Sequence, residues 1–205
     1  MNPAWSIPLI AYLLGSIPFG YLIVKLREGR DIRAAGSGNI GAANVTRTIG
    51  LGAGIATLLL DASKGYFAVW LAGWMKEENI RWMIVAAVAA MVGHLFTVFL
   101  KFKGGRGVAT GVGAFLPICW PAVVGAFVVW VLVIFAFRYV SLASMTAAAA
   151  LPPLIYALYA PPHAPPMELS IGAVIAAVLI IWRHRPNIGR LIDGTEPRLK
   201  LRGRK

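Results

Sequence analysis

The 205-residue chain is poor in acidic residues and has a single cysteine, Cys119. Only 8 side chains are Asp or Glu, and no D-x-x-D pattern or histidine cluster offers a cage for Mg²⁺ or Zn²⁺. One cysteine allows no intramolecular disulfide. The sequence therefore predicts no metal site and no cofactor, and it leaves Arg and Lys to balance the charge of a bound anion.

Charged residues of either sign are also scarce. They make up 14 % of the chain against 59 % hydrophobic residues, and the mean hydropathy of +0.72 excludes a soluble domain of this size. The net charge of +12 suggests nucleic-acid binding, but the basic residues lie in short runs between apolar blocks and in the tail. That distribution is typical of membrane topology signals, so we expect no nucleic-acid partner.

Six apolar blocks are present, most of them near the ~20 residues that a helix needs to cross a bilayer. They cover residues 3–24, 49–75, 82–100, 108–137, 140–159 and 169–182. The block 108–137 is too long for one crossing, and Pro117 and Pro121 predict a turn between two helices inside it. Because no charged n-region precedes the first block, we expect it to stay as a membrane helix. The sequence thus predicts an all-α, polytopic membrane bundle of about seven transmembrane helices.

Charge asymmetry predicts the orientation of this bundle. Segments 25–47, 101–106 and the tail from 183 are rich in Lys and Arg, which places them in the cytoplasm, whereas loops 76–81 and 160–166 carry no net charge. The single domain, 1–205, therefore begins outside and ends in a basic cytoplasmic tail, 195–205, against anionic lipid. A re-entrant hairpin over 108–121 would also return the chain to the side from which it entered, as a pair of crossings does. Seven and five crossings therefore both remain open.

Three unusual segments fall on the same predicted face: GSGNIGAANVTRTIG (36–50), KFKGGRGVATGVG (101–113) and RHRPNIGRLIDGTE (183–196). The first two combine glycines, whose exposed N–H groups can converge on an anion, with a nearby cation and an expected helix start. The third adds Arg183, Arg185 and Arg190, with His184 and Asn187 spaced to share one helical face. Together they predict a phosphate-binding face.

Each segment also has a plainer interpretation. Lys/Arg loops at membrane helix ends often anchor lipid headgroups, and GVATGVG is typical of close helix packing. GSGNIG matches G-x-G-x-x-G, but no expected strand precedes it, which argues against a dinucleotide fold. His94 fits a structural histidine, and Asp61 with Lys64 fits a local ion pair at bundle depth. The coincidence of three segments on one side favours a substrate site.

These segments, with GHLFTVFL before the second and LLLDASKG and SLASM between them, closely resemble the bacterial acyl-phosphate:glycerol-3-phosphate acyltransferase family. The resemblance runs in order over most of the chain. It implies a seven-helix enzyme of the bacterial cytoplasmic (inner) membrane, with a cytoplasmic active face, that acts in the first step of phospholipid synthesis. The enzyme would transfer a fatty acyl group from acyl phosphate to the primary (sn-1) hydroxyl of glycerol 3-phosphate, giving lysophosphatidic acid and inorganic phosphate.

The resemblance also implies the partners. They are acyl phosphate, glycerol 3-phosphate and membrane lipids, with a functional coupling to the enzyme that makes acyl phosphate as a further expectation. Neither acyl-CoA nor acyl carrier protein would serve as donor.

Residue roles follow from the same resemblance. The pocket for the donor phosphate would be formed by Ser37, Gly38, Asn39, Gly41 and Asn44. The acceptor side would be lined by Arg47, Lys103, Arg106, Ser144, His184 and Asn187, beside the glycine pair Gly104 and Gly105. Within these sets, the expected catalytic residues are Ser37, Asn39, Arg47, His184 and Asn187.

Two positions depart from the family pattern. Arg106 stands where Lys is commoner, which keeps the charge but replaces a point charge with a planar fork. Ala43 stands where Thr is common, so no hydroxyl role is assumed there.

The expected chemistry needs alignment more than a strong base, because acyl phosphate already carries a good leaving group. The H-x-x-x-x-D pattern of other glycerolipid acyltransferases is absent, since the fifth positions after His94 and His184 are Phe99 and Gly189. Cys119 is expected near the outer turn, which argues against a thiol nucleophile. We therefore expect direct attack in a ternary complex, with the acceptor's own phosphate or His184 receiving the proton.

Two other classes of function remain as alternatives. A transporter for an organic phosphate would use similar cationic pockets, but the chain shows no internal repeat and the segments gather at one face. A noncatalytic headgroup-binding protein would explain the basic loops but not the glycine-rich detail.

Overall fold

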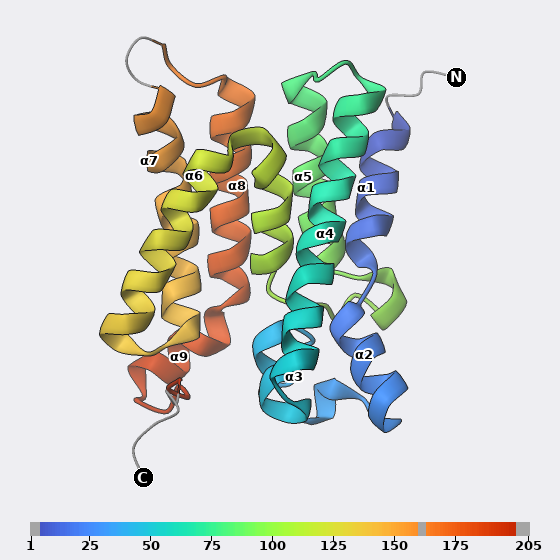
Figure 1. Ribbon diagram of the computed structural model, residues 1–205, viewed down its shortest axis with the longest axis vertical. Helices are drawn as coiled ribbons and strands as arrows, with labels where there is room; N and C mark the ends of the chain where they lie inside the picture. The colour runs from blue at the N-terminus through green and yellow to red at the C-terminus, as the bar shows by residue number, and fades with distance from the viewer. Residues whose placement is uncertain (1–4, 160–162, 200–205) are drawn as a thin grey trace.

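The computed structural model describes residues 5–159 and 163–199, and all regular elements within these ranges are helices (Figure 1). The all-α prediction is therefore confirmed. Residues 200–205 of the predicted tail lie outside the described ranges. In chain order the elements are α1 (Ser6–Ser16), α2 (Phe19–Glu28), η2 (Ile32–Ala34), α3 (Ala42–Ile49), α4 (Leu51–Met75), α5 (Ile80–Leu95), η3 (Val98–Leu100), α6 (Val108–Phe137), α7 (Val140–Tyr159), α8 (Met167–Arg183) and α9 (Arg185–Ile192).

Five stretches are long and apolar enough to cross a membrane. They are Ser6–Glu28, Leu51–Met75, Ile80–Leu100, Val108–Phe137 and Val140–Tyr159. A sixth is added if α8 and α9, which meet at 55°, are counted as one span. The described ends, α1 and α9, lie at opposite ends of the bundle (Figure 1). Seven crossings, and the outside and cytoplasmic placement of the termini, stay predictions.

The long element α6 is two helical arms rather than one rod. Cys119 has non-helical dihedrals (φ −150°, ψ 70°) between Pro117 and Pro121, where the turn was expected. The chain rises beside α5, bends and descends again, so both ends of α6 lie in the lower part of the bundle (Figure 1). At 1.5 Å per residue the first arm spans about 16 Å, roughly half the thickness of a bilayer core. The second arm is correspondingly the longer.

The first apolar block, expected as one helix, is broken between α1 and α2 at Pro18. A proline disfavours helical geometry in the residue before it, here Ile17, whose ψ is 117°. Other helices supply polar partners at the break. The carbonyl of Ser16 accepts the hydroxyl of Thr97 (2.5 Å), and that of Ile17 accepts the ammonium of Lys64 (2.7 Å). A broken membrane helix is tolerated where side chains satisfy the freed backbone in this way.

Small residues set the helix contacts on both sides of α4 and α5. Gly15 of α1 lies against Ala90 of α5, and Gly113 of α6 lies against Ala62 of α4. At each glycine a Cβ would overlap the backbone of the neighbouring helix. In lipid the hydrophobic effect does not drive helices together, so close van der Waals packing at small residues holds them in contact. It also fixes the position of the first turns of α6, which begin within the second unusual segment.

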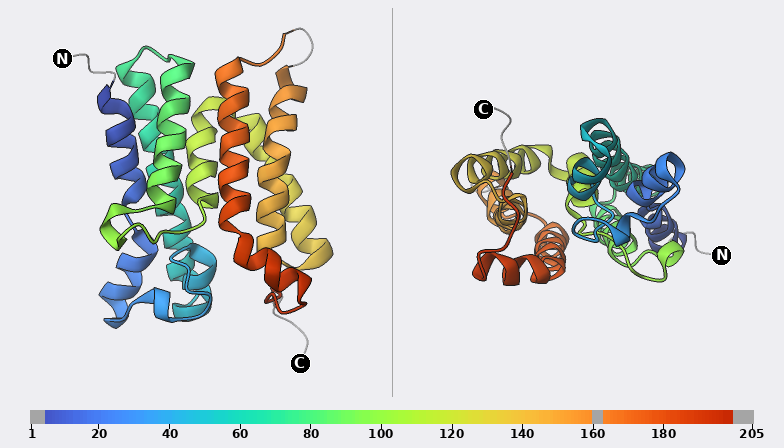
Figure 2. Two further views of the ribbon diagram at one scale, coloured as in Figure 1. Left: turned by 180° about the vertical axis from the view of Figure 1, so that it is seen from behind. Right: turned by 90° about the horizontal axis from the view of Figure 1, so that it is seen from below.

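Seen along the bundle, α1, α4 and α5 form one group and α7, α8 and the second arm of α6 form another (Figure 2). The first arm of α6 lies between the groups. The helices α2, α3 and α9 gather at one end of the bundle (Figure 1). The three unusual segments therefore reach the same end, as their charges predicted.

We predict that Gly113→Val lowers the thermal unfolding temperature in detergent by roughly 5 °C, because its side chain would overlap the backbone of Ala62. The matched control is Gly52→Ala in α4, where a Cβ would meet nothing within 4 Å and the unfolding temperature should not fall. Equal unfolding temperatures for wild type and Gly113→Val would contradict the packing argument.

Candidate active site

The three unusual segments meet at one cavity of about 250 Å³. Each segment contributes residues to its wall, although at least fifty residues separate each segment from the next. The lining residues are Ser37, Gly38, Asn39, Gly104, Arg106, Trp182, Arg183, Arg185, Pro186 and Arg190. The predicted phosphate-binding face is thus a single concave site in the described structure.

The cavity wall carries four guanidinium groups and no carboxylate. A guanidinium binds phosphate through two parallel N–H donors, so this wall suits multiply charged phosphate groups. Burial, together with the nearby charge of Arg190, lowers the pKa of Arg106 to about 10, which still leaves it protonated at neutral pH. Arg106 donates no hydrogen bond within residues 5–159 and 163–199, so its donors remain available to a ligand.

The first wall, residues 37–39, is shaped from behind by Asn44. This side chain is 1 % exposed. Its Oδ1 accepts the backbone N–H of Ser37 (2.9 Å), and its Nδ2 donates to the carbonyls of Ala35 (3.0 Å) and Asn39 (2.8 Å). Gly38 adopts φ +70°, which favours glycine. Asn44 therefore holds the loop, and its amide makes these contacts instead of lining the cavity.

The second wall, Gly104 and its neighbours, is attached to the end of α5. The N–H of Gly104 donates to the carbonyl of Leu95 (3.1 Å), and that of Gly105 donates to the carbonyl of His94 (3.0 Å). On the other side, Arg183 donates to the carbonyls of Gly104 (3.0 Å) and Gly105 (3.1 Å). The N–H groups of the glycine pair thus bond to carbonyls in the last turn of α5, and the carbonyls of the pair hold the guanidinium of Arg183 from the third segment.

The expectation that exposed backbone N–H groups of the glycine-rich segments converge on the anion is wrong for four residues, three glycines and Ser37. The N–H groups of Gly104 and Gly105 cap α5, that of Ser37 donates to Asn44, and that of Gly38 donates to Ala35 (3.1 Å). Backbone donors satisfied within the fold do not add to phosphate affinity. The side chains of the cavity wall must supply that affinity instead.

The third wall is formed by lining residues between 182 and 190. It is held in place by Glu196, a residue that the sequence analysis did not assign. Its carboxylate accepts hydrogen bonds from Ser141 (2.6 Å), Asn187 (2.7 Å) and Arg190 (2.7 Å). Burial raises the pKa of Glu196, but these hydrogen bonds and the charge of Arg190 outweigh burial and lower it. The sequence signal was a carboxylate at the end of a strongly basic motif. The contact ties the tail to α7 and α9.

His184 and Asn187 are both buried beside this wall but do not line the cavity. His184 Nδ1 lies 2.7 Å from the carbonyl of Ile180, which has no proton to give, so Nδ1 is the donor. The neutral ring then keeps Nε2 as an acceptor. Asn187 Oδ1 has no hydrogen-bond partner among the described residues. Both residues thus retain one acceptor atom.

The remaining expected residues do not line the cavity. Ser144 donates to the carbonyl of Val140 (2.8 Å) and accepts from Trp130 (3.3 Å) within the α6–α7 packing. Arg47 and Lys103 are exposed. Gly41 precedes α3 as its N-terminal cap residue. Of the thirteen expected residues, the cavity gathers Ser37, Gly38, Asn39, Gly104 and Arg106.

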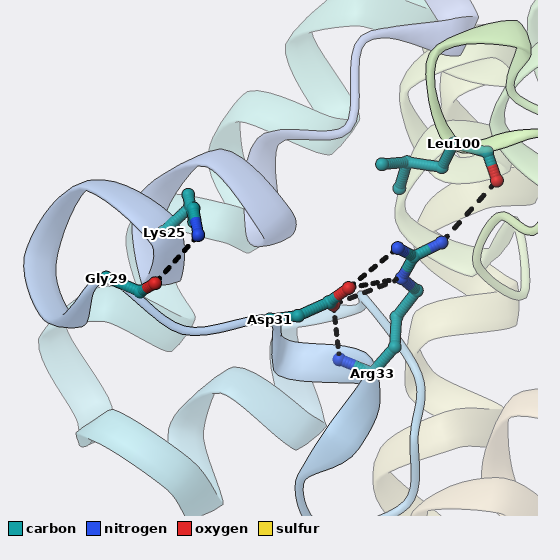
Figure 3. A network of polar contacts seen from close by, with 5 residues as sticks. All are labelled: Lys25, Gly29, Asp31, Arg33 and Leu100. Carbon is teal, nitrogen blue, oxygen red and sulfur yellow. Dashed lines mark hydrogen bonds and ion pairs between the residues drawn. The ribbon is translucent and has the colours of Figure 1, made fainter.

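A second feature missed at the sequence level links the chain just before the first segment to the chain just before the second. Arg33 donates to Asp31 through Nε (3.0 Å) and Nη2 (2.6 Å), and through Nη1 to the carbonyl of Leu100 (3.5 Å). Figure 3 shows its side chain pointing from η2 toward Leu100 at the end of η3. Lys25 closes the preceding turn on the carbonyl of Gly29 (2.7 Å). The approach to the first wall is thus fastened to the turn before the second.

The sequence pattern that describes glycerol-3-phosphate acyltransferases matches residues 5–194, a range that includes all three walls of the cavity. The chain belongs to the glycerol-3-phosphate acyltransferase family. The resemblance seen in the three segments is confirmed. This acyltransferase is an integral membrane enzyme of phospholipid synthesis.

Relatives and solved structures agree with this assignment. The glycerol-3-phosphate acyltransferase of Mesorhizobium japonicum is 44 % identical over 195 residues, covering 95 % of each chain. That of Trichlorobacter lovleyi is 47 % identical over 190 residues, covering 93 % of this chain and 94 % of its own.

Two crystal structures of PlsY (YgiH), an integral membrane glycerol 3-phosphate acyltransferase, share the fold. Its glycerol 3-phosphate form superposes with a TM-score of 0.90 at 37 % identity, covering 97 % of this chain and 96 % of that one. Its lysophosphatidic acid form gives 0.87 at 35 % identity with the same coverage.

We predict that Asn44→Asp lowers turnover by about 10- to 100-fold, because a carboxylate oxygen would then face the carbonyls of Ala35 and Asn39. Acyl transfer by the purified variant measures this effect. Thr48→Val is the control on the same helix, since it removes a hydroxyl that bonds only back to Asn44 O (2.8 Å), and its turnover should stay within about twofold. Wild-type turnover in Asn44→Asp would refute the role assigned to the amide.

A second prediction concerns pH. Because the pKa of Glu196 is lowered by folding, its contribution to stability is present above the ordinary carboxyl pKa and is lost as pH falls through the lowered value. The unfolding temperature of the wild type should therefore fall on acidification through about two pH units, from roughly pH 5 to roughly pH 3. In Glu196→Gln it should be lower at neutral pH and less sensitive to acid.

The control for this pH series is Glu28→Gln, which disrupts an exposed pair with Arg30. It should keep the acid sensitivity of the wild type. The same acid sensitivity in Glu196→Gln as in wild type would mean that another carboxylate carries it.

Proposed function

We propose that this glycerol-3-phosphate acyltransferase uses acyl phosphate as its donor and acylates the primary (sn-1) hydroxyl of glycerol 3-phosphate. The products are lysophosphatidic acid and inorganic phosphate. The observation that carries the proposal is the cavity itself, where four guanidinium groups converge without a lining carboxylate. Both substrates present a phosphate group, and together they require cationic donors on more than one side.

The residues divide the work by position. Arg106 comes from the second segment, whereas Arg185 and Arg190 come from the third, so phosphate groups are held from opposing walls. The hydroxyl of Ser37 and the amide of Asn39 add neutral donors at the first wall. Held in this way, the acceptor hydroxyl and the donor carbonyl react as neighbours rather than by collision, which lowers the entropic barrier.

The proposed step is direct attack. A bond forms between the hydroxyl oxygen and the acyl carbon, the bond from that carbon to the phosphate oxygen breaks, and phosphate leaves with the bonding pair. The proton passes to the acceptor's own phosphate or to Nε2 of His184, whose Nδ1 is engaged with Ile180. Cys119 lies at the bend of α6, at the other end of its first arm from the cavity, so no thiol step is included.

The membrane setting follows from the same geometry. We infer that the cavity faces the cytoplasm of a bacterial inner membrane, because the segments that form it carry the excess of Lys and Arg. Glycerol 3-phosphate would enter from water, and the acyl chain of the donor would remain in lipid. An acyl-phosphate-producing enzyme is the expected functional partner.

The deciding experiment supplies purified enzyme with acyl phosphate and glycerol 3-phosphate in the presence of EDTA. Phosphate and lysophosphatidic acid should appear in equal amounts, and no acyl-enzyme should accumulate with donor alone. Folded protein that releases neither product would overturn the proposal. Uptake of glycerol 3-phosphate into liposomes without acylation would favour a transporter.

We predict that Arg106→Met lowers kcat/KM by roughly 10- to 100-fold, the loss expected for a charge-assisted hydrogen bond to phosphate. Arg106→Lys should retain more activity because it keeps the charge but loses the fork. Arg27→Met removes a cation from the last turn of α2, and it should leave kcat/KM within about twofold. Equal losses in Arg106→Met and Arg27→Met would mean that net charge alone is being measured.

A further inference from the structure

Three ionisable side chains are buried inside the bundle without lining the cavity. Asp61 and Lys64 belong to α4, and His94 belongs to α5, with exposed fractions of 2 %, 4 % and 3 %. Lys64 Nζ lies 2.8 Å from Asp61 Oδ1, and His94 Nδ1 lies 3.6 Å from the same oxygen. Buried charges are costly even when paired, and inside a membrane bundle they mark function. The acyl transfer step described above does not use them.

Lys64 connects this cluster to the first wall. Its ammonium donates to the carbonyl of Ile17 (2.7 Å), at the break between α1 and α2. Immediately after the break, Gly20 packs so closely on the carbonyl of Ile40 that a Cβ would overlap it. Ile40 directly follows the 37–39 wall of the cavity. A shift of Lys64 would therefore move the start of α2, and through the Gly20–Ile40 contact it would move the first wall.

His94 connects the same cluster to the second wall. Its carbonyl accepts the N–H of Gly105 (3.0 Å). Gly105 also lies against the imidazole, where a Cβ would overlap Nε2. Its two neighbours, Gly104 and Arg106, line the cavity. The imidazole of His94 therefore contacts Asp61 and also supports Gly105 of the second wall.

We propose that Asp61, Lys64 and His94 are positioning residues that set the distance between the first and second walls of the cavity. The inference rests on the proposed function of that cavity. An ion pair in a low-dielectric interior is directional and stiff, because each partner left alone would be an uncompensated buried charge. Placement matters in this reaction, since an error of about 1 Å in aligning reactants costs on the order of 100-fold in rate.

The test removes both charges together. Asp61→Asn with Lys64→Met keeps the side-chain volumes close to those of the wild type and leaves neither buried charge without its partner. The double variant should remain folded in detergent, with kcat/KM reduced by about tenfold or more. A general loss of stability would lower the unfolding temperature as well, so both quantities are measured on each preparation.

A direct distance measurement separates positioning from stability. Spin labels are attached through Ala34→Cys and Lys101→Cys, exposed positions that precede the first and second walls, in a Cys119→Ala background. The distance distribution between the labels should broaden or shift in the double variant. The control is Glu28→Gln with Arg30→Met, which likewise removes one negative and one positive charge, but from an exposed ion pair. It should leave the distribution and kcat/KM unchanged.

Three results would overturn the proposal: wild-type kcat/KM in the double variant, an unchanged distance distribution, or an equal response from the control. If the double variant does not fold, His94→Gln decides, because it leaves the Asp61–Lys64 pair in place and should still change the distribution. If the wild type shows no acyl transfer, the proposed function fails, whereas the distance measurement still tests the positioning claim by itself.

Discussion

Repulsion among the guanidinium groups around one small cavity is the constraint on which the rest of this structure depends. Like charges this close repel one another, and three of the four guanidinium groups have a local partner. Arg190 is paired with Glu196 at 2.7 Å, and Arg183 is tethered to the carbonyls of the glycine turn. Arg185 lies over the ring of Trp182 at 4.6 Å, a cation–π contact. These contacts hold a cationic wall in place before any phosphate arrives.

Arg106 differs from the other three. It makes no hydrogen bond to the described residues, and its pKa of about 10 reflects burial and the charge of Arg190. A bound phosphate would relieve both effects, so this side chain has the most to gain from a ligand. The backbone N–H groups of the glycine turn have no such capacity, because they already cap α5. In the proposed site the anion would therefore be bound by side chains, and the glycines supply the shape of the cavity wall.

The membrane imposes a second constraint, which is that every backbone group at depth needs a partner. The break at Pro18 meets it with Thr97 and Lys64 from other helices. The bend of α6 at Cys119 turns the chain back toward the end where it began. Both irregularities bring loops to the cavity without requiring more helices. The positions of the functional segments thus follow from where the helices are broken as much as from where they run.

The sequence by itself determined the fold class, the family and the end of the bundle where the site lies. Those features depend on composition, on long apolar blocks and on charge runs, all of which are local patterns. It also indicated the bend of α6, since Pro117 and Pro121 lie within an overlong block. A proline, Pro18, also marks the break between α1 and α2. Because the apolar block around Pro18 has the length of a single crossing, its length gives no sign of a break.

Only the tertiary structure decided which residues line the cavity and which support it. Asn44 and Gly105 carry the same motif signal as Ser37, yet their polar groups are used within the fold and they do not line the cavity. Glu196 is a partner of Arg190 because α7, α9 and the tail converge there. A hydrogen bond is shared between segments distant in sequence, so its donor or acceptor atoms are assigned only when the chain has folded.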